Sequence, residues 1–391
     1  MDQTARAPRI LQYTYGGAQL SGIDSYLLET YRALDTSVLQ FDLLFRYDVP
    51  FTAEQLRELH AKGARIASLR ISETFNPLLK QGLEAARLWR FFSRNRYDAI
   101  EINMTSTFMC IQATFIAMLF GTKVRIVHAH DAASTESPWK KRLKALASPL
   151  LRALATSRWA CAPEAAEYLF GEQTITSRSW TLVNNSIDVD RFVFQAATRD
   201  RMRKELGLSG ELAVGLVGRL NPQKNPEFAL VVFKDLLRGQ PDAHLFVVGD
   251  GPLRTKLERL SNSLGIARSV HFLGRRHDVE QLFQAFDVIL APSLHEGFPI
   301  IAIEAQASGA PMVVSHAFPP SSEIIPGILT RLGLNIDAEG WASALRSARP
   351  VTERRHAAEQ VRAAGYDRVD AVAGLLNAYA DAGAIAPATP Q

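Results

Sequence analysis

The stretch AVGLVGRLNPQKNPEFALVVFKDLL, residues 213–237, joins a short apolar run to a longer segment through a polar turn. The run Ala213–Val217 has the length and composition of a buried strand, and Glu227–Leu237 has apolar residues at helical spacing. A buried strand that leads directly into a helix is the repeating unit of open α/β sheets. This stretch therefore predicts an α/β fold.

The same alternation continues on both sides, across most of the 391 residues. The predicted strands are Ile10–Tyr15, Gln40–Phe45, Arg65–Leu69, Ala99–Asn103, Val124–His128, Trp180–Val183, His244–Val248, Val270–Phe272, Val288–Ala291 and Pro311–Ser315. The predicted helices are Ile23–Leu34, Ala53–Lys62, Asn76–Ser93, Phe108–Phe120, Gly251–Leu264, Val279–Phe286 and Pro299–Ala307. This pattern predicts parallel sheets, and so many units exceed one sheet, so we expect two Rossmann-like domains.

The boundary between these domains is expected in NNSIDVDRFVFQAATRD, a polar stretch that interrupts the alternation. Two domains also fit the chain length at about 150 residues per domain. We place the first domain at residues 1–190 and the second at residues 191–345. Residues 346–391 are predicted to form helices that pack back towards the first domain and to end in a frayed tail.

The charge of the chain is unevenly distributed. The 44 Lys and Arg residues exceed the 40 Asp and Glu residues by only +4. Between Arg57 and Arg158, however, 17 basic residues face 7 acidic ones, a local surplus of +10, and the remainder of the chain carries −6. Such a field favours an anionic partner or an anionic surface.

Composition also excludes several classes of protein. Two cysteines, Cys110 and Cys161, are too few for a disulfide scaffold or a cysteine-built zinc site. The first residues, MDQTARAPRILQYTYGG, lack the apolar core of a signal peptide. The longest apolar run, Phe108–Phe120, is too short to span a bilayer. We therefore expect a cytoplasmic chain without a membrane span.

The turn GRLNPQKN, residues 218–225, is the strongest candidate for a binding site. It places Arg219 and Lys224 directly after a predicted strand, where open α/β sheets bind their ligands. An arginine fork beside a lysine point charge suits a diphosphate. The alternative is a solvated loop that happens to carry two cations.

Two further turns place glycines between a strand and a helix, YTYGGAQLSGID at 13–24 and GDGP at 249–252. Gly22, Gly249 and Gly251 could let backbone amides approach an anion at a helix N-terminus. Alternatively, the backbone alone requires glycine there. Neither turn completes G-x-G-x-x-G and no P-loop motif occurs, which argues against a nicotinamide oxidoreductase or a P-loop enzyme.

Two carboxylates lie in HEGFPIIAIEAQASGAP, residues 295–311. Glu296 is in a turn after a predicted strand, and Glu304 is on the following helix among apolar residues. A carboxylate in apolar surroundings is costly unless it is paired or hydrogen-bonded. Glu304 is therefore either part of a buried salt bridge or an acceptor for the vicinal hydroxyls of a ligand.

Taken in order, these motifs resemble the C-terminal domain of retaining GT-B glycosyltransferases of family 4. The resemblance rests on GRLNPQKN, on GDGPLR at 249–254 and on DVILAPSLHEGFPIIAIEAQASGAP at 287–311. VNNSID at 183–188 resembles the linker motif of the family, and SGIDSYLLETYRALD and VRIVHAHDAAS resemble its exopolysaccharide and capsule branch. The resemblance implies two Rossmann-like domains that face each other across a cleft, with the acceptor in the first and a nucleotide sugar in the second.

The resemblance also implies roles for the two cations. Arg219 and Lys224 would neutralise the diphosphate of the donor, where negative charge builds up as the nucleotide departs. Because these side chains supply the positive charge and no DxD-type acidic cluster occurs, we expect no metal ion and no other cofactor. The expected donor is a UDP-sugar, which is the most frequent donor type in the family.

The carboxylate motif would bind the rest of the donor. By the same resemblance, Glu304 would hold the ribose hydroxyls. Glu296, together with the backbone of Gly297, Phe298 and Pro299, would contact the donor sugar and its phosphate.

Two histidines end the predicted strand Val124–His128. The family places a histidine near the donor sugar and the acceptor at this point. We prefer His130, because His130 and Asp131 match the usual histidine–aspartate pair, and we keep His128 as the second choice. The expected task is to position the reacting groups or to contact the donor sugar, since front-face transfer lets the leaving phosphate accept the proton. A core histidine without a site role is the alternative.

Three positions depart from the family pattern. The first glycine turn has Ser21 before Gly22, where two glycines are frequent. Ser186 replaces the glycine of the linker motif, and Asn103 lies where relatives often have a histidine. These departures concern the acceptor side more than the phosphate site.

Two basic segments also carry aromatic residues and account for much of the local surplus. RLWRFFSRNR, Arg87–Arg96, carries four arginines, and Pro138–Trp159 carries cations between two tryptophans: Lys140, Lys141, Arg142, Lys144, Arg152 and Arg158. Basic and aromatic residues together suit an anionic membrane surface. An amphipathic helix with inward aromatics and solvated charges explains them equally well, and no nucleic-acid-binding module is present.

We therefore predict a metal-independent retaining glycosyltransferase that moves a sugar from a nucleotide sugar to a lipid-diphosphate-linked or glycan acceptor in surface polysaccharide synthesis. Peripheral contact with the inner leaflet of the plasma membrane is expected. Two alternatives remain: an epimerase or hydrolase of the same fold, and a non-catalytic partner that binds nucleotide sugar within an assembly complex.

Overall fold

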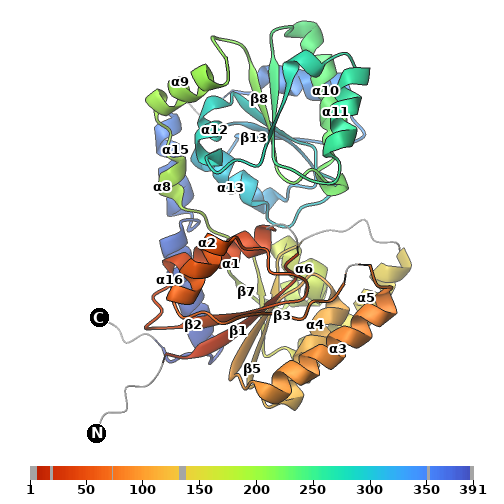
Figure 1. The fold of residues 1–391 in the computed structure, drawn as a ribbon, viewed down its shortest axis with the longest axis vertical. Coiled ribbons are helices and arrows are strands. Elements are labelled where there is room, and N and C mark those ends of the chain that lie inside the picture. Colours follow the sequence, from red (N-terminus) through yellow and green to blue (C-terminus); the bar gives the residue numbers. More distant parts are fainter. Residues whose placement is uncertain (1–6, 18–20, 73, 132–137, 350–352, 388–391) are drawn as a thin grey trace. The chain divides into compact units, whose positions relative to one another are not determined.

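The computed structural model describes residues 7–17, 21–72, 74–131, 138–349 and 353–387 (Figure 1). The chain divides into two compact units. Unit 1 comprises Met1–Ser186 and Arg368–Gln391, and unit 2 comprises Ile187–Asp367. Each unit is built on its own parallel sheet with helices between the strands, which confirms the predicted α/β fold of two Rossmann-like domains.

The described part of unit 1 contains a seven-stranded parallel sheet in the order β3-β2-β1-β4-β5-β6-β7. Its strands are β1 Arg9–Thr14, β2 Gln40–Phe45, β3 Ile66–Ser68, β4 Ala99–Asn103, β5 Val124–Ala129, β6 Ser157–Ala160 and β7 Thr181–Leu182. Its helices are α1 Gly22–Ala33, α2 Ala53–Ala61, α3 Pro77–Arg94, α4 Thr107–Leu119, α5 Pro138–Leu154, α6 Pro163–Phe170, α7 Glu172–Thr176 and α16 Arg368–Asp381. The strand order reverses between β1 and β4, so their carboxyl ends form the switch point at which open sheets bind ligands.

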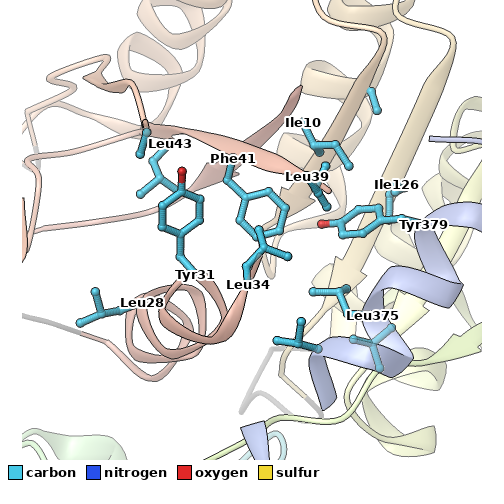
Figure 2. Packing of buried hydrophobic residues seen from close by; sticks show 14 of the residues in the cluster. Ile10, Leu28, Tyr31, Leu34, Leu39, Phe41, Leu43, Ile126, Leu375 and Tyr379 are labelled. Atoms are coloured by element: carbon cyan, nitrogen blue, oxygen red, sulfur yellow. The ribbon is translucent and has the colours of Figure 1, made fainter. Parts of the chain in front are cut away.

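The core of unit 1 lies between this sheet and helices from both ends of the chain. Leu28 and Tyr31 of α1 pack with Phe41 of β2, and Leu375 and Tyr379 of α16 complete the same buried cluster (Figure 2). Helix α16, at the C-terminal end of the described chain, therefore packs in the core of unit 1.

The described part of unit 2 contains a six-stranded parallel sheet in the order β10-β9-β8-β11-β12-β13. Its strands are β8 Ala213–Val217, β9 His244–Val248, β10 Val270–Gly274, β11 Val288–Ala291, β12 Met312–Ser315 and β13 Leu329–Leu332. Its helices are α8 Val189–Phe192, α9 Ala196–Glu205, α10 Pro226–Gly239, α11 Arg254–Ser263, α12 Val279–Ala285, α13 Ile300–Ala307, α14 Ala338–Ser347 and α15 Arg354–Ala363, with short 3₁₀ turns η1 Pro222–Lys224, η2 Ala267–Ser269 and η3 Pro320–Ser322. Here the order reverses between β8 and β11.

The structure differs from the sequence prediction at a few elements. β6 was not predicted, because SRWA is short and carries an arginine, and β13 was missed for a similar reason. The predicted linker contains two helices, α8 and α9, and α9 is polar on nearly every face and so gives little periodic signal. The units divide after Ser186 and Asp367, whereas we expected divisions after 190 and 345. α15 accordingly belongs to unit 2, and α16 is the tail helix that packs in unit 1.

No helix within the described ranges is both long enough and apolar enough to cross a membrane.

Candidate active site

The predicted site residues fall into two groups, one in each unit. In unit 2, the loop after β8 is shaped by two asparagines. Asn221 caps the turn η1 by accepting a hydrogen bond from the backbone N–H of Lys224 at 3.1 Å. Asn225 ends the turn in the left-handed region, with φ at +51°, and Pro226 then begins α10. The residue types of this turn therefore fix where the backbone presents Arg219 and Lys224.

Lys224 contacts Glu296 directly. Its Nζ lies 2.6 Å from Oε1 of Glu296, whose side chain is only 5% exposed. The loops that carry them are also joined through the backbone: the N–H of Leu294 donates to the carbonyl of Gln223 at 2.7 Å. Two residues that are distant in sequence are thereby held together at the carboxyl ends of neighbouring strands, beside a small pocket also lined by Ser293.

Arg219 differs from Lys224 in that its side chain has no partner among the residues that the structure describes. Its side chain is exposed, and within the described part of the chain it forms no ion pair or side-chain hydrogen bond. This guanidinium is free to bind an anionic ligand as a fork.

Glu304 of α13 is a half-buried carboxylate without a partner among the described residues. Burial raises its pKa to about 7, while Arg191 and Lys224 act in the opposite direction. The salt bridge that was one explanation for Glu304 is therefore not formed. A carboxylate left open in this way can accept hydrogen bonds from ligand hydroxyls.

Close packing against the loop that carries Arg219 requires glycine at positions 249 and 251. A Cβ atom on Gly249 would lie 2.0 Å from the carbonyl oxygen of Gly218, and one on Gly251 would lie 2.4 Å from that of Leu220. The N–H of Leu220 donates to the carbonyl of Asp250 at 2.9 Å, so the two loops are in direct contact. These glycines support the loop that carries Arg219, whatever else they contact.

The residues that follow Glu296 are buried and lead into α13. Gly297, Phe298 and Pro299 are all buried, and Pro299 immediately precedes the first turn of the helix. The ring of Phe298 stacks on Tyr366 with centroids 5.3 Å apart. The side chain of Phe298 therefore packs within unit 2, which leaves the backbone of this segment as its means of contacting a ligand.

In unit 1, Gly22 is the first residue of α1. Ser21 caps that helix: its hydroxyl accepts from the N–H of Asp24 at 3.3 Å, and the Asp24 carboxylate accepts from the N–H of Ser21 at 2.9 Å. Serine is a preferred residue at this position, which explains why the chain has Ser21 here. Residues 18–20 of the same turn lie outside the described residues.

The two histidines lie side by side, with ring centroids 4.0 Å apart. His128 is fully buried, and its Nδ1 lies 2.8 Å from Oε1 of Glu101. His130 is half-buried, and its Nε2 lies 2.7 Å from Oδ1 of Asn103. Burial and the neighbouring His128 hold the pKa of His130 well below its usual range, so the ring is neutral. Of the two, only His130 retains access to solvent, as a ligand-contacting residue must.

Several polar residues around these sites were not predicted from the sequence. Gln12 of β1 and Glu101 of β4 are buried beneath the histidines, and Ser293 lines the pocket in unit 2 with a buried hydroxyl that has no described partner. The available signal was a polar residue inside a short apolar strand, as in AIEIN. No three or more His, Cys, Asp or Glu side chains gather in metal-binding geometry within the described ranges.

Two Rossmann-like units, with two cations and two carboxylates at the carboxyl edge of the second sheet, define the class of GT-B glycosyltransferases. Residues 198–368 match the family "Glycosyl transferases group 1", and residues 21–186 match the "Glycosyl transferase 4-like domain". The chain is also 30% identical over 381 residues to the glycosyltransferase EpsF of Bacillus subtilis (strain 168), covering 94% of this chain and 95% of EpsF. The chain therefore belongs to the family 4 type of glycosyltransferases, as the resemblance predicted.

Further relatives agree with this assignment. The chain is 26% identical over 304 residues to the Escherichia coli UDP-Gal:α-D-GlcNAc-diphosphoundecaprenol α-1,3-galactosyltransferase, over 76% of each protein. The fold resembles that of Anabaena HepE in complex with UDP, with a TM-score of 0.73 and 18% identity over 95% of this chain and 100% of HepE. The second likeness confirms the GT-B fold.

Proposed function

We propose that this glycosyltransferase moves a sugar from a UDP-sugar to a lipid-diphosphate-linked or glycan acceptor in the synthesis of a surface polysaccharide. The donor is suggested by HepE, whose structures contain UDP or UDP-glucose. The acceptor is suggested by the E. coli galactosyltransferase, whose name specifies GlcNAc-diphosphoundecaprenol. The pathway is suggested by the resemblance of SGIDSYLLETYRALD and VRIVHAHDAAS to the exopolysaccharide and capsule branch of the family.

The observation that carries the proposal is the arrangement of Arg219, Lys224, Glu296 and Glu304. The guanidinium of Arg219 is exposed and has no partner among the described residues. Lys224 forms a salt bridge with Glu296 at the edge of a pocket. In the proposed reaction both cations bind the donor diphosphate and stabilise the charge that develops as UDP departs. Glu304 accepts hydrogen bonds from the ribose hydroxyls, and Glu296 orients Lys224 and contacts the donor sugar.

We further propose that the anomeric configuration is retained and that no metal ion is required. Arg219 and Lys224 supply the positive charge that a divalent cation would otherwise supply. His130 is neutral and half-buried, which suits a residue that contacts a sugar hydroxyl. The leaving phosphate would take the proton of the acceptor. An assay with and without EDTA tests the metal proposal, and NMR of the product linkage tests retention; loss of activity in EDTA that Mg²⁺ or Mn²⁺ restores would contradict the first.

A thermal-shift screen with UDP, UDP-glucose, UDP-galactose and GDP-mannose tests the donor site. A ligand at 100 times its Kd stabilises the native state by about 2.7 kcal/mol. Lys224→Ala should abolish most of the shift, whereas Lys256→Ala, at an exposed lysine of the same unit, should leave it unchanged. An unchanged shift in Lys224→Ala would remove the proposed site. Product analysis with and without acceptor separates a transferase from an epimerase or hydrolase.

The proposed membrane contact uses helices α3, α4 and α5 of unit 1, which pack against one another in sequence order (Figure 1). We call the exposed apolar side chains on these helices the apolar face. They are Leu78, Leu79, Trp89, Phe108, Phe115, Met118, Leu119, Trp139, Leu143, Leu146 and Leu150. Exposed apolar side chains concentrated on three packed helices support an interaction site for a protein or a membrane.

Helix α5 combines this face with positive charge. Trp139, Leu143, Leu146 and Leu150 follow the spacing of one helix face, and Lys141 and Arg142 are exposed beside them. The expectation of two tryptophan anchors is corrected, because Trp159 is buried in β6. Arg152 and Arg158 are also engaged, as both donate to backbone carbonyls.

Co-sedimentation with vesicles tests this contact. We expect the protein to bind phosphatidylglycerol vesicles more strongly than phosphatidylcholine vesicles. Leu146→Glu/Leu150→Glu should weaken both, and Lys141→Glu/Arg142→Glu should weaken only the first. Lys256→Glu in unit 2 serves as the control. Equal binding by all variants would contradict the proposal.

A further inference from the structure

A chain of buried polar side chains runs beneath His130, across the carboxyl halves of three neighbouring strands. Gln12 comes from β1, Glu101 and Asn103 from β4, and His128 from the end of β5. Tyr379 of α16 joins them from the last helix of the chain. Gln12, Glu101, Asn103, His128 and Tyr379 are at most 1% exposed, so each polar atom here has to find its partner within the protein.

The carboxylate of Glu101, at one end of this series of hydrogen bonds, determines which groups donate and which accept. His128 Nδ1 lies 2.8 Å from its Oε1, and the Nε2 of Gln12 lies 2.9 Å from its Oε2. The hydroxyl of Tyr379 also donates to Oε2. A carboxylate accepts hydrogen bonds, so the Gln12 amide must turn its NH₂ group towards Glu101 and its carbonyl oxygen away.

The orientation of Gln12 then determines that of Asn103. The Oε1 of Gln12 accepts a hydrogen bond from Nδ2 of Asn103 at 2.8 Å. Since the NH₂ group of Asn103 is used in this way, its Oδ1 is the atom that faces Nε2 of His130, at 2.7 Å. Oδ1 can only accept, so Nε2 of His130 must carry the proton.

The other nitrogen of His130 is left as an acceptor. Within the described residues Nδ1 of His130 has no hydrogen-bond partner, and the ring is flanked by His128 at 4.0 Å and Tyr26 at 5.4 Å between centroids. Its ring is half-buried, unlike that of His128. A neutral imidazole with its Nε2–H committed to the protein offers Nδ1 to a hydroxyl donor.

We propose that Asn103 is a positioning residue that holds His130 as its Nε2–H tautomer, so that Nδ1 accepts a hydrogen bond from a hydroxyl of the bound sugar. The second half of this statement rests on the proposed function, whereas the tautomer does not. A planar amide satisfies both neighbours at once, since its donor and its acceptor branch from one carbon.

The tautomer can be measured without any activity. Long-range ¹H–¹⁵N NMR of the full chain, labelled at histidine, distinguishes a protonated Nδ1 from a protonated Nε2, and His130→Gln assigns the signals. We expect a neutral His130 protonated at Nε2 in the wild type at pH 7. A His130 ring protonated at Nδ1, or a doubly protonated ring, would overturn the proposal.

Two variants separate positioning from general disturbance of the buried chain. Asn103→Leu removes the bond to His130, so we expect a mixture of tautomers and a fall in kcat of about tenfold, the value of one hydrogen bond. Tyr379→Phe removes a donor at the far end, so the wild-type tautomer should persist. If Asn103→Leu keeps the wild-type tautomer, Asn103 does not set it. If the tautomer changes in Asn103→Leu as expected but the wild-type protein transfers no sugar, the proposed function is wrong. The role of Asn103 in setting the tautomer of His130 then still holds.

Discussion

The two groups of candidate site residues, one in each unit, are built in opposite ways. In unit 1 the polar side chains near His130 are buried, and the His130 ring is neutral. Hydrogen bonds connect these side chains from Tyr379 through Glu101 and Gln12 to Asn103. In unit 2 the groups are charged and partly open: Arg219 and Glu304 have no partner in the described chain. A bonded network fixes orientation, whereas open charges bind a charged ligand.

This difference predicts where substitution affects stability and where it affects activity. Residues of the bonded network should lower the free energy of unfolding when they are removed, because their partners stay buried. Removing an exposed charge such as Arg219 should weaken ligand binding and catalysis with little effect on the stability of the free protein. The comparison can therefore be tested residue by residue.

The largest effect is expected at the cations of unit 2. Arg219→Ala and Lys224→Ala should each lower kcat/KM by about 10²- to 10³-fold, the usual cost of removing a donor to developing negative charge. Arg219→Ala should leave the melting temperature of the free protein unchanged, because this side chain is exposed and has no partner among the described residues. Lys224→Ala should also lower it, because Glu296 would remain buried and unpaired.

Steady-state kinetics and calorimetry measure both quantities on the same samples. Lys256→Ala is the control for loss of a lysine in unit 2. If Arg219→Ala destabilised the free protein as much as Lys224→Ala does, the distinction between open and bonded charges within unit 2 would be lost.

The second prediction compares the two histidines. His128→Ala removes one of the three donors to the buried Glu101 carboxylate and leaves a cavity in place of a fully buried ring, so it should lower the free energy of unfolding by about 2–4 kcal/mol. His130→Ala removes a half-buried ring whose hydrogen-bond partner, Asn103, keeps its bond to Gln12, so it should cost less stability than His128→Ala and more activity. Urea denaturation and transfer rates for both variants decide between these outcomes. A catalytic defect confined to His128→Ala would make His128 the site residue.

The third prediction concerns the pH dependence caused by Glu304. Its pKa is raised to about 7 by burial, so the native carboxyl holds its proton at pH values where the unfolded chain has lost it. Stability from this group is fully present below the ordinary pKa of a glutamate and is lost as pH rises towards 7. Glu304→Gln, which has no charge to bury, should therefore gain stability relative to the wild type between pH 4.5 and pH 8.

The expected gain is about 2 kcal/mol, since residual contact with water limits the effect of burial. Denaturant unfolding at several pH values measures it, and Glu258→Gln on an exposed helix face of the same unit is the control. A pH-independent difference between Glu304→Gln and the wild type would show that the carboxyl is ionised throughout.

The sequence could predict the strands and candidate site residues of unit 2, but not which carboxylate forms the salt bridge with Lys224. Lys224 and Glu296 follow strands that are neighbours in the sheet, so proximity could be expected from parallel topology alone. The choice between Glu296 and Glu304 as the partner of Lys224 could not be predicted, because the spacing of a motif does not determine side-chain rotamers. Glu304 was the candidate for a buried salt bridge, and Glu296 forms it.

Unit 1 was harder to predict for a different reason. Helical periodicity identified a helical tail, but the position of α16 against β1 and β4 depends on contacts between residues more than 250 positions apart, as in Tyr379 and Glu101. Glu101 and Gln12 are polar residues in short central strands, and the sequence alone does not show which groups satisfy them once they are buried. In the structure, Tyr379 of α16 is hydrogen-bonded to both.

The smallest effect is expected at Tyr379, the far end of the bonded network. Tyr379→Phe keeps the ring in the core of unit 1 and removes one of the three donors to Glu101 (Figure 2). Because Gln12 and His128 still donate to the carboxylate, the free energy of unfolding should fall by about 1 kcal/mol, the net value of one hydrogen bond. Urea denaturation measures this, and Tyr31→Phe, whose hydroxyl donates to the carbonyl of Lys62 at 3.2 Å in the same core, is the matched control. A loss in Tyr379→Phe several times that of Tyr31→Phe would mean that the network is cooperative, and would widen the contrast with the open charges of unit 2. A loss near zero would mean that Glu101 is satisfied without α16, so that the last helix contributes packing but no polar contact to the site.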